Sequence, residues 1–191
     1  MSKILFYHAS PVKGIKTLLP SPSDGGKQVL YFSQKRENVL VYLSNAVEKY
    51  CRETNFHHRG QWAKWGPYGF ERDGRLRLEE YWPHALEETY RGVSGCIYRA
   101  ETLPPPVSAS SVPFAVFCEK PVPVSECEEI PDAYEEILSA ERDGLISILR
   151  YSDLSSRRKE WLQTTVRAEY EKSAERPEYK HFLEGKFSRL L

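Results

Sequence analysis

The segment ILFYHASP (residues 4–11) sets how the chain begins to fold. Its first four residues are apolar, and the run stops at His8 and Ser10, just before Pro11. A short apolar run that ends in polar residues and a proline is typical of a buried β-strand. The sequence therefore predicts a first strand at residues 4–7 that carries a histidine at its end.

A second strand and a helix follow this segment. Residues 29–32 (VLYF) are β-branched and aromatic, as in a buried strand. Ser33 comes next, and its side chain can cap a helix. Apolar residues then recur at spacings of three and four, which predicts an amphipathic helix of about four turns. This stripe consists of Val39, Tyr42, Leu43, Ala46, Val47 and Tyr50.

Residues 52–92 differ in composition from the rest of the chain. Glycines and prolines interrupt regular structure repeatedly, yet Trp62, Trp65 and Trp82, three of the four tryptophans, lie here. Because a buried aromatic side chain removes about 150–250 Å² from water, we expect this aromatic-rich insertion to pack tightly. Two interpretations stay open: an irregular lid over the core, and a wall of a binding site.

The remaining sequence contains further strands and two helices. Asp132 can cap one helix, with Glu135 as its capping-box partner, and Ser156 begins a C-terminal helix. About six strands and three helices without regular βαβ alternation predict the α+β fold class. We expect a single domain with an extension. The later strands are predicted at residues 94–100, 113–118, 122–129 and 145–151. The single domain is predicted to span residues 1–191, with the aromatic-rich insertion at about 52–92 and the helical extension at about 152–191.

Composition excludes several classes of protein. The 191 residues are 40% hydrophobic, which suffices for a core and argues against intrinsic disorder. Lys and Arg number 27, as do Asp and Glu, and this zero net charge argues against general nucleic-acid binding and membrane-surface binding. No apolar run of about 18 residues could span a membrane. With no export signal, the sequence predicts a cytoplasmic protein.

Cysteines and histidines lack the spacing of a metal site. The four cysteines form no CxxC pair and no Cys/His cluster at zinc spacing, so we expect reduced thiols. The doublet His57-His58 has no cysteine or carboxylate at ligand spacing, so no metal ion is predicted there either. The cysteines are Cys51, Cys96, Cys118 and Cys127.

Three short motifs belong together in chain order. The first is Tyr7-His8-Ala9-Ser10, and the second is Leu30-Tyr31-Phe32-Ser33, with Tyr42 eleven residues after Tyr31. The third is Glu128-Glu129-Ile130 near the end of a late strand. Together the motifs resemble the ADP-ribosyltransferase superfamily, on the His-Tyr-Glu branch of diphtheria-toxin-like enzymes and poly(ADP-ribose) polymerases. The resemblance covers residues 4–47 and 122–130.

This resemblance implies an ADP-ribosyltransferase-like fold of split antiparallel sheets with flanking helices, and NAD+ as co-substrate. The implied reaction is transfer of ADP-ribose to an unknown macromolecular or small-molecule acceptor, or hydrolysis of NAD+. Its transition state is oxocarbenium-like, so positioning and charge supply most of the catalysis. The implied cofactor-binding residues are His8, Ala9, Tyr31, Ser33 and Tyr42, and the implied catalytic residues are Glu128 and His8.

Each residue type suits its implied role. His8 would hold the ribose, and the backbone of Ala9 would hold the nicotinamide amide. Tyr31 and Tyr42 would sandwich the nicotinamide ring. Glu128 would stabilise the developing positive charge. We prefer this carboxylate because the Glu-x-Ile pattern begins there, although Glu119, Glu126 and Glu129 compete. Glu126 and Glu128 would share one strand face with Val122 and Val124.

Two positions depart from the family pattern and keep alternatives open. Ala9 stands where the family prefers glycine, and its methyl group could crowd the nicotinamide amide. Val39 stands where the polymerases place a serine, which removes one hydrogen bond worth about 1 kcal/mol. The alternative is therefore a non-catalytic binding or interaction module on the same fold, with a decayed NAD site.

Arginines bear on two further alternatives. A phosphotransferase acting on an RNA 2′-phosphate would need several arginines around its cleft, and the first fifty residues contain only Arg36. Arg75 and Arg77 would lie on one side of an extended strand and could pair a pyrophosphate. The other interpretation of that stretch is a solvated hairpin.

Overall fold

The structure is a computed structural model that describes residues 4–23, 26–65 and 68–191. Its chain forms two compact units, and each is described by itself. Residues 66 and 67 of the predicted insertion lie outside the described residues. The first unit consists of Met1–Leu43, Phe70–Leu76 and Tyr90–Ser147, and the second of Ser44–Gly69, Arg77–Thr89 and Ile148–Leu191.

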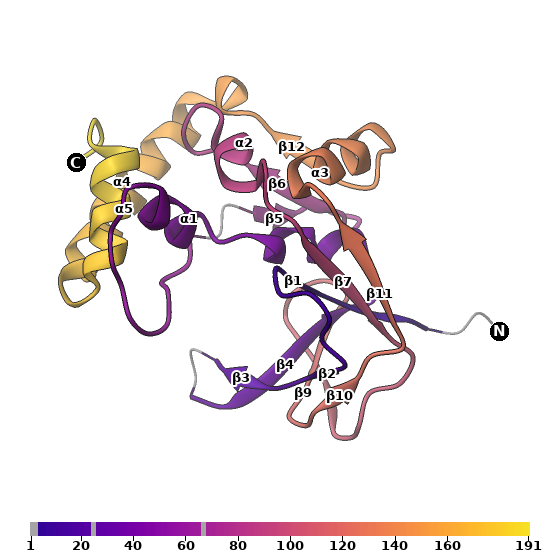
Figure 1. Cartoon of the computed structure of the whole chain (residues 1–191). Helices are drawn as coiled ribbons and strands as arrows, with labels where there is room; N and C mark the ends of the chain where they lie inside the picture. Colours follow the sequence, from indigo (N-terminus) through magenta and orange to yellow (C-terminus); the bar gives the residue numbers. More distant parts are fainter. Residues whose placement is uncertain (1–3, 24–25, 66–67) are drawn as a thin grey trace. The chain divides into compact units, whose positions relative to one another are not determined.

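The first unit is built on a seven-stranded antiparallel sheet. Its order is β11-β7-β1-β4-β9-β8, with β3 paired to β4 (Figure 1). Together with its helices, this sheet confirms the predicted α+β class. The strands are β1 (Phe6–Ser10), β3 (Ser21–Pro22), β4 (Gln28–Ser33), β7 (Gly95–Ala100), β8 (Val107–Ala109), β9 (Ala115–Cys118) and β11 (Glu126–Ile130). A two-stranded sheet pairs β2 (Thr17–Leu18) with β10 (Val122–Pro123), and the helical elements are the 3-10 helix η1 (Glu37–Leu43) and α3 (Ala133–Arg142).

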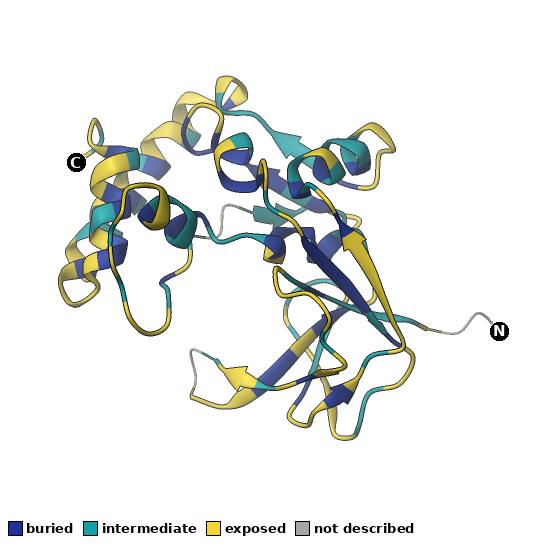
Figure 2. Ribbon diagram, viewed as in Figure 1, coloured by how far each residue is buried: buried dark blue, intermediate teal, exposed yellow. Residues whose placement is uncertain are grey.

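One face of this sheet carries a hydrophobic core. Alternate residues of β7 and β4 point to it, because side chains of a strand alternate between faces. Figure 2 shows β7 buried along its length, whereas β11 at the edge is mostly exposed. The Tyr98 hydroxyl donates to the carbonyl of Val12 at 2.8 Å and accepts from the amide of Ile15 at 3.1 Å. The core consists of Leu18, Leu30, Phe32, Cys96, Tyr98, Ala100, Cys118 and Val122.

The first strand is longer than its apolar run predicts. It begins at Phe6 and ends at Ser10, so His8 lies inside the strand rather than at its end. The reason is β7, which pairs with every residue of β1. Ala9, which lies opposite Ile97 of β7, is buried by this pairing. Pairing with a buried neighbour therefore outweighs the polar character of the HAS sequence.

The predicted four-turn helix is wrong, because two shorter helices replace it. The 3-10 helix η1 ends at Leu43, and α1 (Ala46–Glu53) begins three residues later. Asn45 caps α1, since its side-chain oxygen accepts from the amide of Val47 at 3.1 Å. Its side-chain amide also donates to the carbonyl of Ala63 at 2.9 Å. The apolar stripe is thus shared between the two units, which divide after Leu43.

The strand predicted at residues 122–129 is also divided. Val122 pairs with Leu18 in the small sheet, whereas Glu126 begins β11 in the large one. Between them, the amide of Ser125 donates to the carbonyl of Arg99 at 2.8 Å. Val122 and Glu128 therefore do not share a strand, and the apolar face proposed beside that carboxylate does not exist.

The predicted starts of two helices agree with the structure. Asp132 caps α3, and its carboxylate accepts from the amides of Tyr134 at 2.9 Å and Glu135 at 3.3 Å. The Glu135 side chain does not complete a capping box and instead pairs with Arg91 at 3.5 Å. The C-terminal helix α4 (Ser156–Lys172) begins where predicted, with Ser155 as its cap.

The second unit gathers aromatic residues from distant parts of the chain. Most of the predicted insertion and the predicted C-terminal extension contribute to its hydrophobic core. Its remaining helical elements are α2 (Ala85–Tyr90), α5 (Pro177–Phe187), η2 (Tyr151–Asp153) and η3 (Ser173–Glu175). It also contains most of a three-stranded sheet of order β12-β6-β5, which consists of β5 (Tyr68–Phe70), β6 (Leu76–Glu79) and β12 (Ser147–Leu149). Its core includes Val47, Cys51, Tyr81, Trp82, Leu162, Val166, Tyr179, Phe182, Leu183 and Phe187.

Candidate functional site

The sheet of the first unit is split between β1 and β4. These strands share one residue pair in the structure, Tyr7 with Ser33. By contrast, β1 pairs with β7 over all five of its residues. Beyond the pair, the ring of His8 bridges the strands, because its Nδ1 donates to the carbonyl oxygen of Tyr31 at 2.9 Å. The split therefore opens beside a histidine and a tyrosine that the sequence singles out.

His8 is held in one neutral form. Burial lowers the pKa of its imidazole, and the hydrogen bond to Tyr31 offsets part of that effect. A carbonyl oxygen only accepts, so Nδ1 carries the proton and Nε2 is left as an acceptor. Nε2 has no hydrogen-bond partner among the described residues. The ring centroid of Phe32 lies 5.9 Å from that of His8 and limits its movement.

Strand register separates His8 from Glu128. Across the three strands β11, β7 and β1, Glu128 is paired with Ile97, and Ile97 is paired with Ala9. His8 is instead paired with Tyr98, the residue after Ile97. Side chains of successive residues point to opposite faces of a sheet, so His8 and Glu128 point to opposite faces. Strands are about 4.8 Å apart, and β7 lies between β11 and β1, so their backbones are about 10 Å apart.

Glu128 is engaged by an arginine. Both of its carboxylate oxygens accept from Arg36, at 2.9 Å and 2.5 Å. Arg36 also pairs with Glu136 of α3 at 2.8 Å. The pKa of Arg36 is raised, chiefly by its hydrogen bond to Glu128. Two of the acidic residues that compete with Glu128 are engaged as well, because Glu126 pairs with Arg99 and Glu129 with Lys13.

The two tyrosines keep exposed rings. Tyr31 of β4 is 47% exposed and Tyr42 of η1 is 46% exposed, unlike most large apolar residues around them. The ring of Tyr31 is tilted by 52° to that of Phe117 on the neighbouring strand β9, with 5.6 Å between centroids. Tyr42 therefore does not belong to the core, although it lies on the apolar stripe.

Ser33, Ala9 and Val39 are buried. The Ser33 hydroxyl accepts from the amide of Lys35 at 3.0 Å, which turns the chain after β4 but does not cap η1. Ala9 is packed between strands, and Val39 is only 2% exposed. The structure thus brings the His8 ring to the backbone carbonyl of Tyr31 at the split, whereas the Tyr31 ring points to the other face of β4 from Phe32, the ring beside His8. It leaves Glu128 on an outer strand, about three strand spacings or 14 Å from β4.

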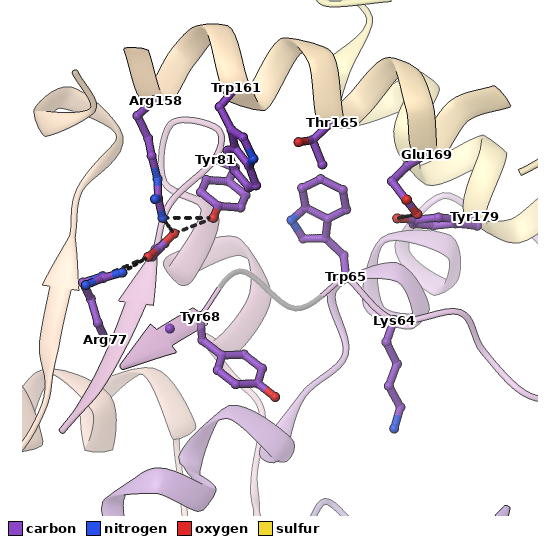
Figure 3. A pocket seen from close by; sticks show the side chains of 12 residues that line it. Lys64, Trp65, Tyr68, Arg77, Tyr81, Arg158, Trp161, Thr165, Glu169 and Tyr179 are labelled. Atoms are coloured by element: carbon purple, nitrogen blue, oxygen red, sulfur yellow. Dashed lines mark hydrogen bonds and ion pairs between the residues drawn. The ribbon is translucent and has the colours of Figure 1, made fainter. Parts of the chain in front are cut away.

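A second cluster of polar residues, not predicted from the sequence, lies in the second unit. Figure 3 shows Arg77, Arg158 and Tyr81 converging, and the carboxylate that joins them is that of Glu79. Arg77 Nε donates to Glu79 at 2.9 Å, and Arg158 and the Tyr81 hydroxyl contact its other oxygen. Burial raises the pKa of Glu79, but these three hydrogen bonds outweigh it, so the pKa is lowered. Burial and Glu79 together raise the pKa of Tyr81.

The sequence contains a signal for this cluster. Arg77, Glu79 and Tyr81 occupy every second position, and Leu76 and Leu78 of β6 are buried. Alternation of this kind places three polar side chains on one face of an extended segment. The hypothesis that Arg75 and Arg77 pair a pyrophosphate is not supported, because Arg77 binds Glu79 and Arg75 donates to the carbonyl of Gly144 at 3.2 Å.

The described residues contain neither a metal-binding cluster nor a membrane-spanning helix. No group of three or more His, Cys, Asp or Glu side chains there could hold a metal ion. Nδ1 of His58 in the doublet lies 3.6 Å from a carboxylate oxygen of Glu178, and its ring is tilted by 57° to that of Trp62. Within residues 4–23, 26–65 and 68–191, no helix is long and apolar enough to cross a membrane.

Comparisons with protein-family models, with curated proteins and with solved structures give no significant match to this chain.

Proposed function

We propose that the first unit binds NAD+ at the split between β1 and β4, in an ADP-ribosyltransferase-like arrangement. The observation that carries the proposal is His8, whose Nδ1 is fixed by the Tyr31 carbonyl where the two strands part. A neutral imidazole held in this way offers Nε2 as an acceptor for a ribose hydroxyl. The split in the sheet agrees with the fold that the motif resemblance implies.

The tyrosines support the same proposal. Both Tyr31 and Tyr42 keep nearly half of their surface exposed, so each ring is available to stack on a flat ring. Stacking on one aromatic side chain changes affinity by about 1–3 kcal/mol. The backbone of Ala9, beside His8, would hold the nicotinamide amide.

Titration calorimetry with NAD+ tests this binding site. We expect Tyr31→Phe to bind as the parent protein does, because the ring is kept. Tyr31→Ala removes an exposed ring, so we expect about a tenfold or greater loss of affinity at unchanged melting temperature. Ala9→Gly should bind equally or more tightly, since it removes a methyl group. No heat and no rise in melting temperature at millimolar NAD+ would contradict the proposal.

The geometry favours binding over turnover. Glu128 accepts two hydrogen bonds from Arg36 and points away from His8, so we propose that it anchors η1 and α3 through Arg36. This corresponds to a non-catalytic binding module.

The described cysteines are all free thiols, in keeping with the cytoplasmic location that the sequence predicts.

Transfer of ADP-ribose is the second candidate function, and the free Nε2 acceptor of His8 is the observation that favours it. Labelled NAD+ incubated with the protein and a cell lysate would place label on an acceptor or release ADP-ribose. If Glu128 is catalytic, Glu128→Gln should lower turnover about a hundredfold. Glu126→Gln and Glu129→Gln are the matched controls, because both carboxylates lie on the same strand and are paired with other cations. Equal, mild effects of all three would show that no single carboxylate is catalytic.

A further inference from the structure

The second unit contains a pocket of about 400 Å³ beside the Glu79 cluster. This size lies within the range of small-molecule sites. Two arginines, Arg77 and Arg158, contact Glu79 at this end of the pocket. At the other end, Glu169 contacts the Tyr179 hydroxyl at 3.3 Å and Lys172 at 3.1 Å. The pocket therefore favours an anion at the arginine end.

Two hydrogen-bond donors in the pocket wall have no partner. They are the indole Nε1 of Trp65 and Nε of Arg158, both buried and unpaired within the part of the chain that the structure describes. In Figure 3 the nitrogen of Trp65 lies on the side of the ring that faces Tyr81. Buried N–H groups are normally satisfied, so two orphaned donors in one pocket indicate an acceptor that a ligand would supply.

Aromatic rings form the rest of the wall. Trp161 of α4 is 46% exposed, and its ring lies 5.6 Å from that of Tyr81 in an edge-to-face arrangement. Arg158 lies over the same indole at 5.1 Å. Trp65 meets Tyr81 edge to face at 5.9 Å. Walls of this kind suit a flat ring, which gains by stacking.

Helix α4 orients three of these residues together. Arg158, Trp161 and Thr165 recur at spacings of three and four, which places them on one face of the helix. Arg77 and Glu79 come from one face of β6, opposite the buried Leu76 and Leu78. The pocket is therefore built on regular elements that the core of the second unit holds in place.

We propose that this pocket binds a flat aromatic molecule that carries one anionic oxygen group, a phosphate or a carboxylate. The ring stacks on Trp161 and Trp65, and the oxyanion accepts from Trp65 Nε1 and from Arg158. A quaternary ammonium ion, which aromatic walls also attract, is disfavoured because two guanidinium groups face the same space. The site is independent of the NAD+ site proposed for the first unit.

Titration calorimetry on the full chain tests the proposal with four probes. Adenosine monophosphate supplies a ring with a phosphate, and indole-3-acetate supplies a ring with a carboxylate. Adenosine and inorganic phosphate carry one feature each. We expect at least one of the first two to bind at least tenfold more tightly than either half-probe. Whichever of the two binds identifies the anionic group.

Matched variants locate the binding. Trp65→Phe keeps an aromatic wall and removes the unpaired donor, whereas Trp62→Phe makes the same change at a tryptophan outside the pocket wall. We expect Trp65→Phe to weaken binding about tenfold and Trp62→Phe to leave it unchanged, with folding of both checked by circular dichroism. Trp161→Ala removes the exposed ring and should weaken binding further. Tyr31→Ala should have no effect, which separates this site from the NAD+ site.

Three results would overturn the proposal. The first is no binding of adenosine monophosphate or indole-3-acetate at millimolar concentration. The second is equal effects of Trp65→Phe and Trp62→Phe. The third is tighter binding of tetramethylammonium, titrated in the same way as a fifth probe, than of either anion, which would indicate a site for a cation.

Discussion

Glu128 of the first unit and Glu79 of the second are both glutamates bound by arginine, and they differ in burial. The Glu128 side chain is 51% exposed and shares Arg36 with Glu136. The Glu79 side chain is 2% exposed and is contacted by Arg77, Arg158 and Tyr81. An exposed ion pair is screened by water, whereas a buried carboxylate depends on its partners for solvation.

This difference changes how each site is recognised. Glu128 is conspicuous in the sequence because it begins a family-like motif, yet its carboxylate lies in an ordinary surface pair. Glu79 lies in no motif, yet its neighbourhood contains the unpaired donors of Trp65 and Arg158. Unsatisfied polar atoms in a cavity therefore point to a site that motif spacing does not reveal.

The largest expected effect is that of Glu79→Gln on stability. The amide cannot neutralise two guanidinium groups, and the Tyr81 hydroxyl loses a charged acceptor. We expect the free energy of unfolding to fall by about 3 kcal/mol, as when one partner of a buried pair is removed. Urea unfolding followed by tryptophan fluorescence measures this change. A loss below that of Glu128→Gln would remove the contrast between the two glutamates.

Gly95→Ala is expected to destabilise the first unit. A Cβ at this position of β7 would lie 2.7 Å from the carbonyl oxygen of Ser10 and 2.8 Å from Leu43 Cδ2. Backbone cannot move aside cheaply, so we expect a loss of about 2 kcal/mol, typical of overpacking. Gly144→Ala is the control, since it has free space but a φ of +70°, and it should cost about 1 kcal/mol.

Glu128→Gln is expected to have a small effect on stability. The side chain is half exposed, and Gln keeps its shape while losing charge. We expect the free energy of unfolding to change by less than about 1 kcal/mol, and less still in high salt. Denaturant titrations at low and high ionic strength provide the measurement. A salt-insensitive loss of several kcal/mol would show that Arg36 requires this carboxylate to organise the first unit.

The smallest expected effect is a pH dependence from His8. Its pKa is lowered in the folded state, so the unfolded chain takes up the proton first as the pH falls below 6.5. Stability then decreases through the window between 6.5 and the lowered folded pKa, and it is unaffected by His8 above that window. His8→Asn keeps a donor for the Tyr31 carbonyl and cannot titrate, so its stability should vary less with pH over that window. An equal slope in both proteins would place the titrating group elsewhere.

Local signals in the sequence predicted part of this molecule. The α+β class, the Asp132 cap and the start of α4 each depend on neighbouring residues, and the structure contains all three. The predicted helix through residues 39–50 failed because Asn45 can cap a new helix, which outweighs a continuous apolar stripe. The predicted strand at 122–129 failed because Pro123 and Ser125 connect two different sheets.

The candidate sites show the same limit. His8 and Tyr31 lie on adjacent strands, and their motifs indicated a common site. Separation of Glu128 from them follows from strand order and register, which spacing along the chain does not reveal. The pocket of the second unit joins Trp65 and Tyr81 to Arg158 and Tyr179, which lie 77 to 114 positions later, so it exists only once the chain has folded.

The interleaving of the two units has a consequence for synthesis on the ribosome. All residues of the first unit have been made once the chain reaches Ser147, whereas the second unit needs segments up to Leu191. Its core joins Val47 and Trp82 to Phe182 and Phe187 of the last helix. During translation these earlier aromatic segments are synthesised before the residues of α5 that they pack against, whereas the first unit can already fold. Nascent chains that end before α5 would therefore expose apolar side chains that the complete chain buries.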